Sequence, residues 1–293
     1  DLGKPETVNK VLDKINQWAK GAGFEQNILN ADAFKGDFAA MLISAVRVQA
    51  FWFQDFSESD QKAVFHNFGL KDKLVDGKHL YKSDIEGRLV EFCSDDKVKY
   101  VKHHSRVKSE AGNDLKELVG LNFRAVEIPL QGKVSFIIFE PLANGQGHEL
   151  QELAQTLLDG SKLDKVLKIL DQSNSKAKFD YVSMPKFGFQ NDIDLKISLQ
   201  SMGINKVFDK SSSELRKIIQ GEPVCVDSAK HQAIIDVNKF GLKAAGVTKI
   251  RVVPLMAVIR PEPIDIEVRN PFIFMIRYEQ IPLFFGQLVK LDK

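Results

Sequence analysis

The chain has 293 residues, of which 44% are hydrophobic and 27% charged, and its formal net charge is +2 at pH 7. This balance excludes a disordered chain and gives no overall basis for binding a polyanion. No run of about twenty apolar residues occurs, so the sequence predicts no membrane-spanning helix. The only cysteines are Cys93 and Cys225, which excludes a disulfide framework and leaves open whether the two form one bond.

The first predicted element is an amphipathic helix over residues 7–19, where apolar residues recur at helical spacing before Gly21. Residues 41–53 are mostly apolar and rich in β-branched side chains, which predicts a strand in the middle of a sheet. Residues 65–96 are charged and contain several glycines, so we interpret this stretch as irregular.

The middle of the chain predicts two strands at 119–128 and 134–140, followed by two short helices within 148–171 that Gly160 separates. The remaining predicted elements are a strand at 181–185, a helix at 194–202 and strands at 233–237, 250–253, 264–268, 272–278 and 283–291. Helices and strands do not alternate strictly. The pattern therefore favours an α+β fold with a large mixed or antiparallel sheet over repeated parallel βαβ units.

Common catalytic signatures are absent from the sequence, including G-x-S-x-G, H-E-x-x-H, the P-loop, G-x-G-x-x-G and C-x-x-C. Of the six histidines only His103 and His104 are adjacent, and neighbouring side chains point to opposite faces of a strand. We therefore predict no metal site.

The densest basic run lies between residues 97 and 108. It fits a site for a sulfated polysaccharide or a nucleic acid, and it equally fits the solvated face of an edge strand, where lysines oppose aggregation. The second interpretation is favoured, because such runs usually only solvate a surface. The candidate polyanion-binding residues are Lys97, Lys99, Lys102, Arg106 and Lys108.

Residues 241–263 combine two patterns that conflict. The first half alternates with period two, which is typical of a strand with one buried face, yet it contains small residues of poor strand propensity. The second half carries three prolines and cannot be an interior strand. The residues of the apolar face are Leu242, Ala244, Gly246, Thr248, Ile250 and Val252.

Two interpretations of this segment stay open on the pattern alone. It is either a permanent hairpin or long loop, or a loop that can enter a sheet as a new strand. Insertion would bury Ile250 and Val252, worth about 1.5–3 kcal/mol each, and would add ladder hydrogen bonds worth about 1 kcal/mol each. Over the whole segment these gains are large enough to drive an irreversible transition.

Several stretches together resemble one known family, the serpins, which are protease inhibitors. Residues 182–209 resemble its strand 5A with the helix that follows, and residues 231–241 resemble the approach to its reactive loop. Residues 270–277, NPFIFMIR, and 281–289, IPLFFGQLV, resemble its two C-terminal strands. The remaining matches are residues 8–19 with helix F and residues 41–52 with strand 3A.

The resemblance implies a single α+β domain over residues 1–293. Such a fold has a large mixed central sheet, a second and a third sheet, peripheral helices and an exposed reactive loop at about 241–263. Family members are roughly a third longer than this chain. We therefore expect that an N-terminal segment with helices A to E and two strands of the central sheet is absent from this sequence.

The resemblance also implies a function, which is trapping a target protease as a covalent acyl-enzyme while the cleaved loop inserts into the central sheet. The protein itself would be no enzyme, would need no cofactor and would be secreted and extracellular. The family's spacing places the reactive bond at Leu255–Met256, which suits chymotrypsin-like or elastase-like proteases. A shifted register would select Arg251 or Arg260 and trypsin-like proteases, and papain-like cysteine proteases also fit.

The implied hinge consists of Gly241, Leu242, Ala244, Ala245, Gly246 and Thr248. The implied sheet-opening region consists of Ser44, Trp52 and His231. Several positions depart from the inhibitory pattern: Lys239 replaces a glutamate, Leu242 a threonine or serine, and Ser44, Arg47 and Ala50 replace the asparagine, aromatic and glycine of strand 3A. A non-inhibitory serpin acting as carrier, chaperone or storage protein is therefore the alternative.

Overall fold

The structure of the protein is a computed structural model. The residues described below are 5–21, 27–30, 40–63, 65, 77–94, 99–103, 108–110, 121–142, 147–172, 177–215, 224–242 and 264–291. The chain forms two compact units. Unit 1 comprises residues 1–48 and 188–236, and unit 2 comprises residues 49–187 and 237–293.

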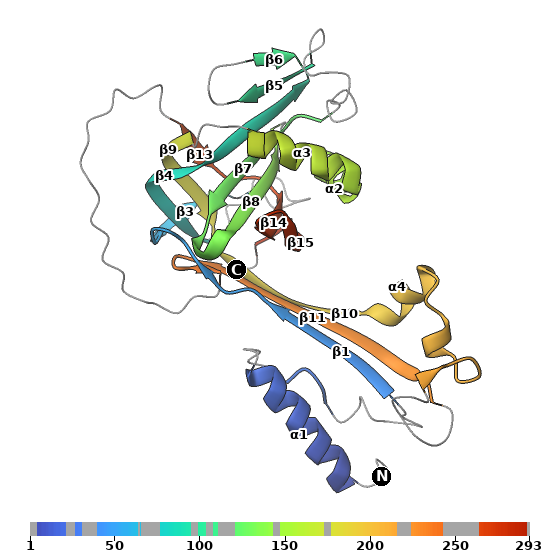
Figure 1. Cartoon of the computed structure of the whole chain (residues 1–293). Helices are drawn as coiled ribbons and strands as arrows, with labels where there is room; N and C mark the ends of the chain where they lie inside the picture. The colour runs from blue at the N-terminus through green and yellow to red at the C-terminus, as the bar shows by residue number, and fades with distance from the viewer. Residues whose placement is uncertain are drawn as a thin grey trace. The chain divides into compact units, whose positions relative to one another are not determined.

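Unit 1 contains a long helix and a group of long strands (Figure 1). Its elements are helix α1 (Pro5–Gly21), strand β1 (Ala40–Arg47), strand β10 (Phe187–Asp194), helix α4 (Leu195–Ser201), the short helix η4 (Lys206–Phe208) and strand β11 (Val226–Asn238). Strand β1 pairs in parallel with β11, and β10 pairs with the other edge of β11. Leu12 and Ala19 of α1 pack in one hydrophobic cluster with Met41, Ile43 and Ile234, so α1 covers one face of this sheet.

Unit 2 is built on a ten-stranded sheet with the order β13-β9-β4-β7-β8-β14-β15, in which β3 and β5 also pair with β4, and β6 pairs with β5 (Figure 1). Its strands are β2 (Ala50–Phe51), β3 (Ser57–Ala63), β4 (Gly77–Ser94), β5 (Lys99–His103), β6 (Lys108–Glu110), β7 (Phe123–Pro129), β8 (Val134–Pro141), β9 (Ala177–Pro185), β12 (Gly241–Leu242), β13 (Asp265–Glu267), β14 (Phe272–Tyr278) and β15 (Ile281–Leu288). The short helix η3 (Gln131–Lys133) joins β7 to β8.

Two helices of unit 2, α2 (Gly147–Leu158) and α3 (Gly160–Gln172), cover one face of this sheet. Their leucines meet the sheet in the main hydrophobic cluster, where side chains of β4, β7, β8 and β14 are almost fully buried. A Cβ atom at Gly160 would have no neighbour within 4 Å, and α3 begins at this residue directly after α2, as the sequence predicts.

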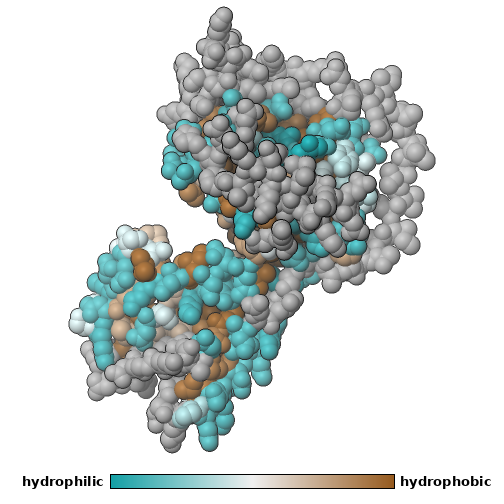
Figure 2. Space-filling view, turned by 180° about the vertical axis from the view of Figure 1, so that it is seen from behind, coloured by the Kyte–Doolittle hydropathy of each residue, from teal (hydrophilic) through white to brown (hydrophobic). Residues whose placement is uncertain are grey.

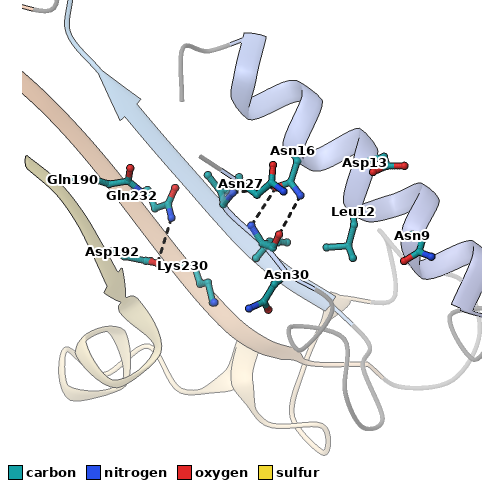
Figure 3. A pocket seen from close by; sticks show the side chains of 12 residues that line it. Asn9, Leu12, Asp13, Asn16, Asn27, Asn30, Gln190, Asp192, Lys230 and Gln232 are labelled. Carbon is teal, nitrogen blue, oxygen red and sulfur yellow. Dashed lines mark hydrogen bonds between the residues drawn. The ribbon is translucent and has the colours of Figure 1, made fainter. Parts of the chain in front are cut away.

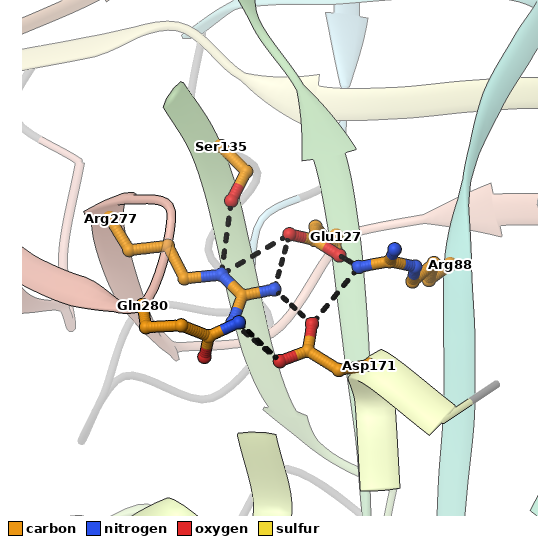
Figure 4. A network of polar contacts seen from close by, with 6 residues as sticks. All are labelled: Arg88, Glu127, Ser135, Asp171, Arg277 and Gln280. Atoms are coloured by element: carbon orange, nitrogen blue, oxygen red, sulfur yellow. Dashed lines mark hydrogen bonds and ion pairs between the residues drawn. The ribbon is translucent and has the colours of Figure 1, made fainter. Parts of the chain in front are cut away.

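A buried polar network connects β14 to α3 and β7 (Figure 4). The Arg277 side chain is 3% exposed, and its Nη2 donates to Glu127 Oε1 at 2.7 Å and to Asp171 Oδ1 at 2.6 Å. Arg88 Nη1 donates to the same two carboxylates at 2.8 and 3.0 Å. Because each charge has an opposite partner, the network satisfies the buried guanidinium and fixes α3 against the sheet.

The interpretation of residues 65–96 as irregular is wrong for 77–94, where β4 runs without interruption. Gly87 is one of the glycines on which that interpretation rests. A Cβ atom at this position would lie 2.4 Å from the Phe179 ring and 2.5 Å from Glu127 O. The glycine therefore permits the close approach of β7 and β9 and does not mark a turn. The predicted strand over 41–53 divides into β1 and β2, and the other predicted elements within the described residues are confirmed with shifted ends.

Candidate functional site

Strand β12 lies at the start of the segment that the sequence singles out. In unit 2, Gly241 and Leu242 pair antiparallel with Asn238 and Val237 at the end of β11, and on their other side with β2. The Leu242 side chain is 1% exposed. The alternating face that the sequence predicts therefore begins at a buried position.

The position of Gly241 accepts no side chain. Its φ is +142°, and a Cβ atom would come within 2.1 Å of Ala50 O and 2.8 Å of Phe51 Cα. Both atoms belong to backbone and cannot rotate away. Glycine is therefore required for β12 to fit against β2.

Trp52 fixes the turn that leads into β12. Its indole Nε1 donates to Asn238 O at 2.9 Å, and its backbone N–H donates to Phe240 O at 3.1 Å. The ring is 1% exposed and lies against Phe56 and Phe136, with centroids 5.1 and 6.0 Å away. Trp52 thus holds the backbone on both sides of Lys239, through its side chain at Asn238 and through its own backbone at Phe240.

The same turn has further supports that the sequence analysis missed. The backbone N–H of Phe56 donates to Lys239 O at 2.9 Å, and Asn238 Oδ1 accepts from the Phe240 N–H at 2.9 Å. The Lys239 ammonium lies 5.0 Å from the centre of the Phe240 ring. In the sequence, Asn238 lies two residues before Phe240 and three before Gly241. An Asn so close before a Gly is a turn signal, and it could have predicted the hydrogen bond from the Phe240 N–H to Asn238 Oδ1.

The chain after residue 263 is anchored just as firmly. The Ile264 N–H donates to Asp180 Oδ2 at 3.0 Å, and the Asp180 N–H donates to Ile264 O at 2.9 Å. Strand β13 then pairs in parallel with β9. Residues 243–263 therefore begin and end at fixed strands of unit 2, while the predicted bond Leu255–Met256 and the hinge residues Ala244, Ala245, Gly246 and Thr248 lie outside the described residues.

Ser44 and His231, predicted for the sheet-opening region, are neighbours in unit 1. They lie opposite each other in the parallel pairing of β1 with β11, and Ser44 Oγ lies 3.2 Å from His231 Nδ1. Trp52, the third residue of that prediction, belongs to unit 2.

The basic run is only partly described. Strand β5 pairs with β6, which sets Lys102 opposite Lys108, and Lys99 begins β5. Lys97 and Arg106 lie outside the described residues, so a polyanion site here stays a prediction.

Other candidate chemistry is sparse in the described part of the chain. Cys225 is a free, half-buried thiol. Among the described residues no group of three or more His, Cys, Asp or Glu could hold a metal ion, and no described helix is long and apolar enough to cross a membrane. The candidate functional site is therefore the turn over residues 238–241, which Trp52 and Phe56 hold in place.

Comparison with known proteins decides the family. The family model described as Serpin (serine protease inhibitor) matches residues 90–291. The chain belongs to the serpin family. This serpin is 25% identical to antichymotrypsin-2 of Bombyx mori over 274 residues. The aligned region covers 93% of this chain and 63% of that protein. It is 32% identical over 139 residues to alpha-1-antiproteinase of Ovis aries, covering 43% of this chain and 32% of that protein.

Solved structures show the same fold. Serpin48 of Tenebrio molitor matches with a TM-score of 0.63 and 20% identity, covering 97% of this serpin and 66% of that chain. Native protease nexin-1, solved with heparin, matches with a TM-score of 0.67 and 23% identity, covering 96% of this serpin and 66% of that chain. The α+β serpin fold is thereby confirmed. The chain spans less than two thirds of the length of the first curated relatives, 63% for antichymotrypsin-2.

Proposed function

We propose that this serpin is an extracellular protease inhibitor that acts as a suicide substrate. The protease nucleophile attacks the Leu255 carbonyl, the peptide bond to Met256 breaks, and the new amino terminus of Met256 leaves while Leu255 stays bonded to the enzyme. The chain that precedes Leu255 then inserts into the sheet as a strand beside β11, before water releases the protease. The serpin supplies conformational free energy and performs no catalysis itself.

The observation that carries this proposal is the pairing of Gly241 and Leu242 with the end of β11. Those two residues already run antiparallel to β11, as the first residues of an inserted strand would. Continued in step along β11, the same register would set Thr248 opposite His231. Leu242 is buried, so period-two alternation would direct Ala244 and Thr248 to the same face as Leu242.

Insertion must first separate two strands. Strand β1 occupies this edge of β11 through eight paired residues, from Ala40 to Arg47, and through the contact of Ser44 with His231. An inserted strand would restore hydrogen bonds to both neighbours, at about 1 kcal/mol net for each added bond. In the projected register the Thr248 hydroxyl would replace that of Ser44 as a partner of His231. Insertion therefore replaces the hydrogen bonds lost when β1 separates from β11. The burial of Ile250 and Val252 stabilises the inserted state further.

The departures from the inhibitory pattern are compatible with this mechanism. The apolar side chain of Leu242, in β12, is already buried, so insertion does not have to move it from solvent into the interior. The Lys239 ammonium lies over the Phe240 ring and adds no buried unpaired charge. A carrier, chaperone or storage protein remains the competing function, because all eight residues of β1 pair with β11, with one register shift between Ala40 and Met41, and this pairing must open for insertion.

We further propose that an N-terminal segment of the same protein covers the second face of the unit 1 sheet. Leu42 and Val46 of β1 point away from the α1 cluster and are 49% and 36% exposed. Phe189 and Ile193 of β10 alternate with residues that face α1, so they share that second face. Figure 2 shows hydrophobic surface of unit 1 in brown. An apolar surface of this kind is normally covered.

The test is incubation of the full-length protein with chymotrypsin, elastase, trypsin and a papain-like cathepsin. A complex with chymotrypsin or elastase that survives boiling in detergent is the expected result, with cleavage after Leu255 found by mass spectrometry. Leu255→Arg should move complex formation to trypsin. Clean cleavage without any complex would contradict inhibition and favour the carrier or storage function.

A further inference from the structure

A polar pocket of about 700 Å³ lies within unit 1, between helix α1 and strands β10 and β11 (Figure 3). Asn9 and Asp13 face it from the helix. On the sheet side it is lined by Gln190, Asp192, Lys230 and Gln232. The proposed inhibitory function uses none of these side chains.

The wall beside α1 is built by hydrogen bonds. Asn16 is 7% exposed, its Nδ2 donates to Leu29 O at 3.1 Å, and its Oδ1 accepts from the N–H groups of Ile28 and Leu29 at 3.0 and 3.2 Å. One amide therefore ties residues 27–30 to the helix. Because the polar atoms of Asn16 are engaged, this residue shapes the pocket and leaves ligand contacts to others.

Gln232 has a buried polar atom without a partner. Its side chain is 4% exposed, and Nε2 donates to Asp192 Oδ2 at 3.3 Å. The other end of the amide, Oε1, has almost no accessible surface and accepts no hydrogen bond within the described residues, and Gln232 is one of the residues that line the pocket. Buried carbonyl oxygens are nearly always paired, so this atom calls for a donor from a bound molecule.

The charges around the pocket select the kind of molecule. Lys230 provides an ammonium donor, while Asp13 and Asp192 provide carboxylate acceptors. An anion would meet two carboxylates and a cation would meet Lys230. A neutral molecule whose groups both donate and accept satisfies all of them, and a hydroxyl group has this property.

We propose that this pocket binds a small neutral saccharide, and that the Gln232 side chain turns on binding so that one hydroxyl donates to its Oε1. Other hydroxyl groups would donate to Asp13 and Asp192 and accept from Lys230. The volume lies in the range of pockets that hold small molecules.

The test is ligand-detected NMR and calorimetry on the intact protein with glucose, N-acetylglucosamine and maltose. Citrate and spermidine serve as charged comparison molecules. We expect at least one saccharide to bind and neither charged molecule to displace it. Absence of binding by all three saccharides, or tighter binding of citrate or spermidine, would overturn the proposal.

Three substitutions test whether the saccharide binds in this pocket. Gln232→Met keeps the length of the side chain and removes the acceptor, so saccharide affinity should fall by about tenfold or more. Gln287→Met makes the same change at an exposed position of β15 and should bind as the unmodified protein does. Asp13→Asn, at an exposed position of α1, should also weaken binding and decides the question if Gln232→Met does not fold.

Unchanged affinity in both Gln232→Met and Asp13→Asn would contradict a site at this pocket. These measurements involve no protease, so they succeed or fail independently of the proposed inhibition.

Discussion

Gly241 lies so close to Ala50 that a Cβ atom on Gly241 would come within 2.1 Å of the Ala50 carbonyl oxygen. This close approach lets β12 pair with β11 and β2 at once. It also fixes the residue from which the proposed inserted strand would grow.

Gly241→Ala should destabilise the protein. The new methyl group meets backbone atoms, and the φ of +142° is unfavourable for alanine, so a loss of about 2–4 kcal/mol in the free energy of unfolding is expected. Urea denaturation followed by tryptophan fluorescence measures it. Gly160→Ala is the control, because open space surrounds that glycine at the start of α3, and a change within about 1 kcal/mol is expected there. Equal effects of the two changes would refute the steric argument.

Asp171 makes part of the stability depend on pH. Burial raises the pKa of this carboxyl group, but the hydrogen bonds and charge of Arg277, with help from Gln280 and Arg88, outweigh burial and lower the pKa. A pKa that is lower in the folded state stabilises the protein above the unfolded value of about 3.9, and this contribution disappears as the pH falls through the folded value.

Asp171→Asn should therefore lower the free energy of unfolding at neutral pH, and its difference from the unmodified protein should shrink in acid. Urea denaturation at several pH values between neutral and strongly acidic checks this. Asp164→Asn removes an exposed carboxylate that pairs with Lys168 on the same helix, and should cost less than about 1 kcal/mol at any pH. A cost of Asp171→Asn that does not vary with pH would contradict the assignment.

The two faces of the proposed inserted strand give a matched pair of variants. By period-two alternation Ala244 would share the face of the buried Leu242 in that strand, so Ala244→Arg would have to bury a charge during insertion and should convert the inhibitor into a substrate. Ala245 would take the face of Lys243 and Lys249, and Ala245→Arg should inhibit normally. The ratio of covalent complex to cleaved serpin on denaturing gels measures both. Equal behaviour of the two variants would count against insertion in this register.

The sequence predicts most of this fold because the amphipathic helices and apolar strands carry clear periodicity. It predicts less where a residue serves a contact that is distant along the chain. Gly87 suggests a turn on its own, and only the Phe179 ring and the Glu127 carbonyl beside it explain why a strand needs glycine there. Charged residues and glycines of this kind conceal the long strand β4 in the sequence.

The candidate site shows the same division. Gly241, Trp52 and the pair of Ser44 with His231 could be selected from sequence through a family resemblance. The support of the backbone at Asn238 and Lys239 could not be predicted from sequence. It depends on hydrogen bonds from Trp52 and Phe56, which lie far away along the chain. The Gln232 pocket likewise requires α1, β10 and β11 to be assembled first.

The central claim is that the chain beyond Gly241 gains stability by joining the sheet after it is cut. Thermal unfolding of the intact protein, compared with protein nicked between Leu255 and Met256, tests this most directly. We predict a clear rise in Tm after nicking, because the new strand adds hydrogen bonds and buries apolar side chains. Identical melting of intact and nicked protein would contradict the claim.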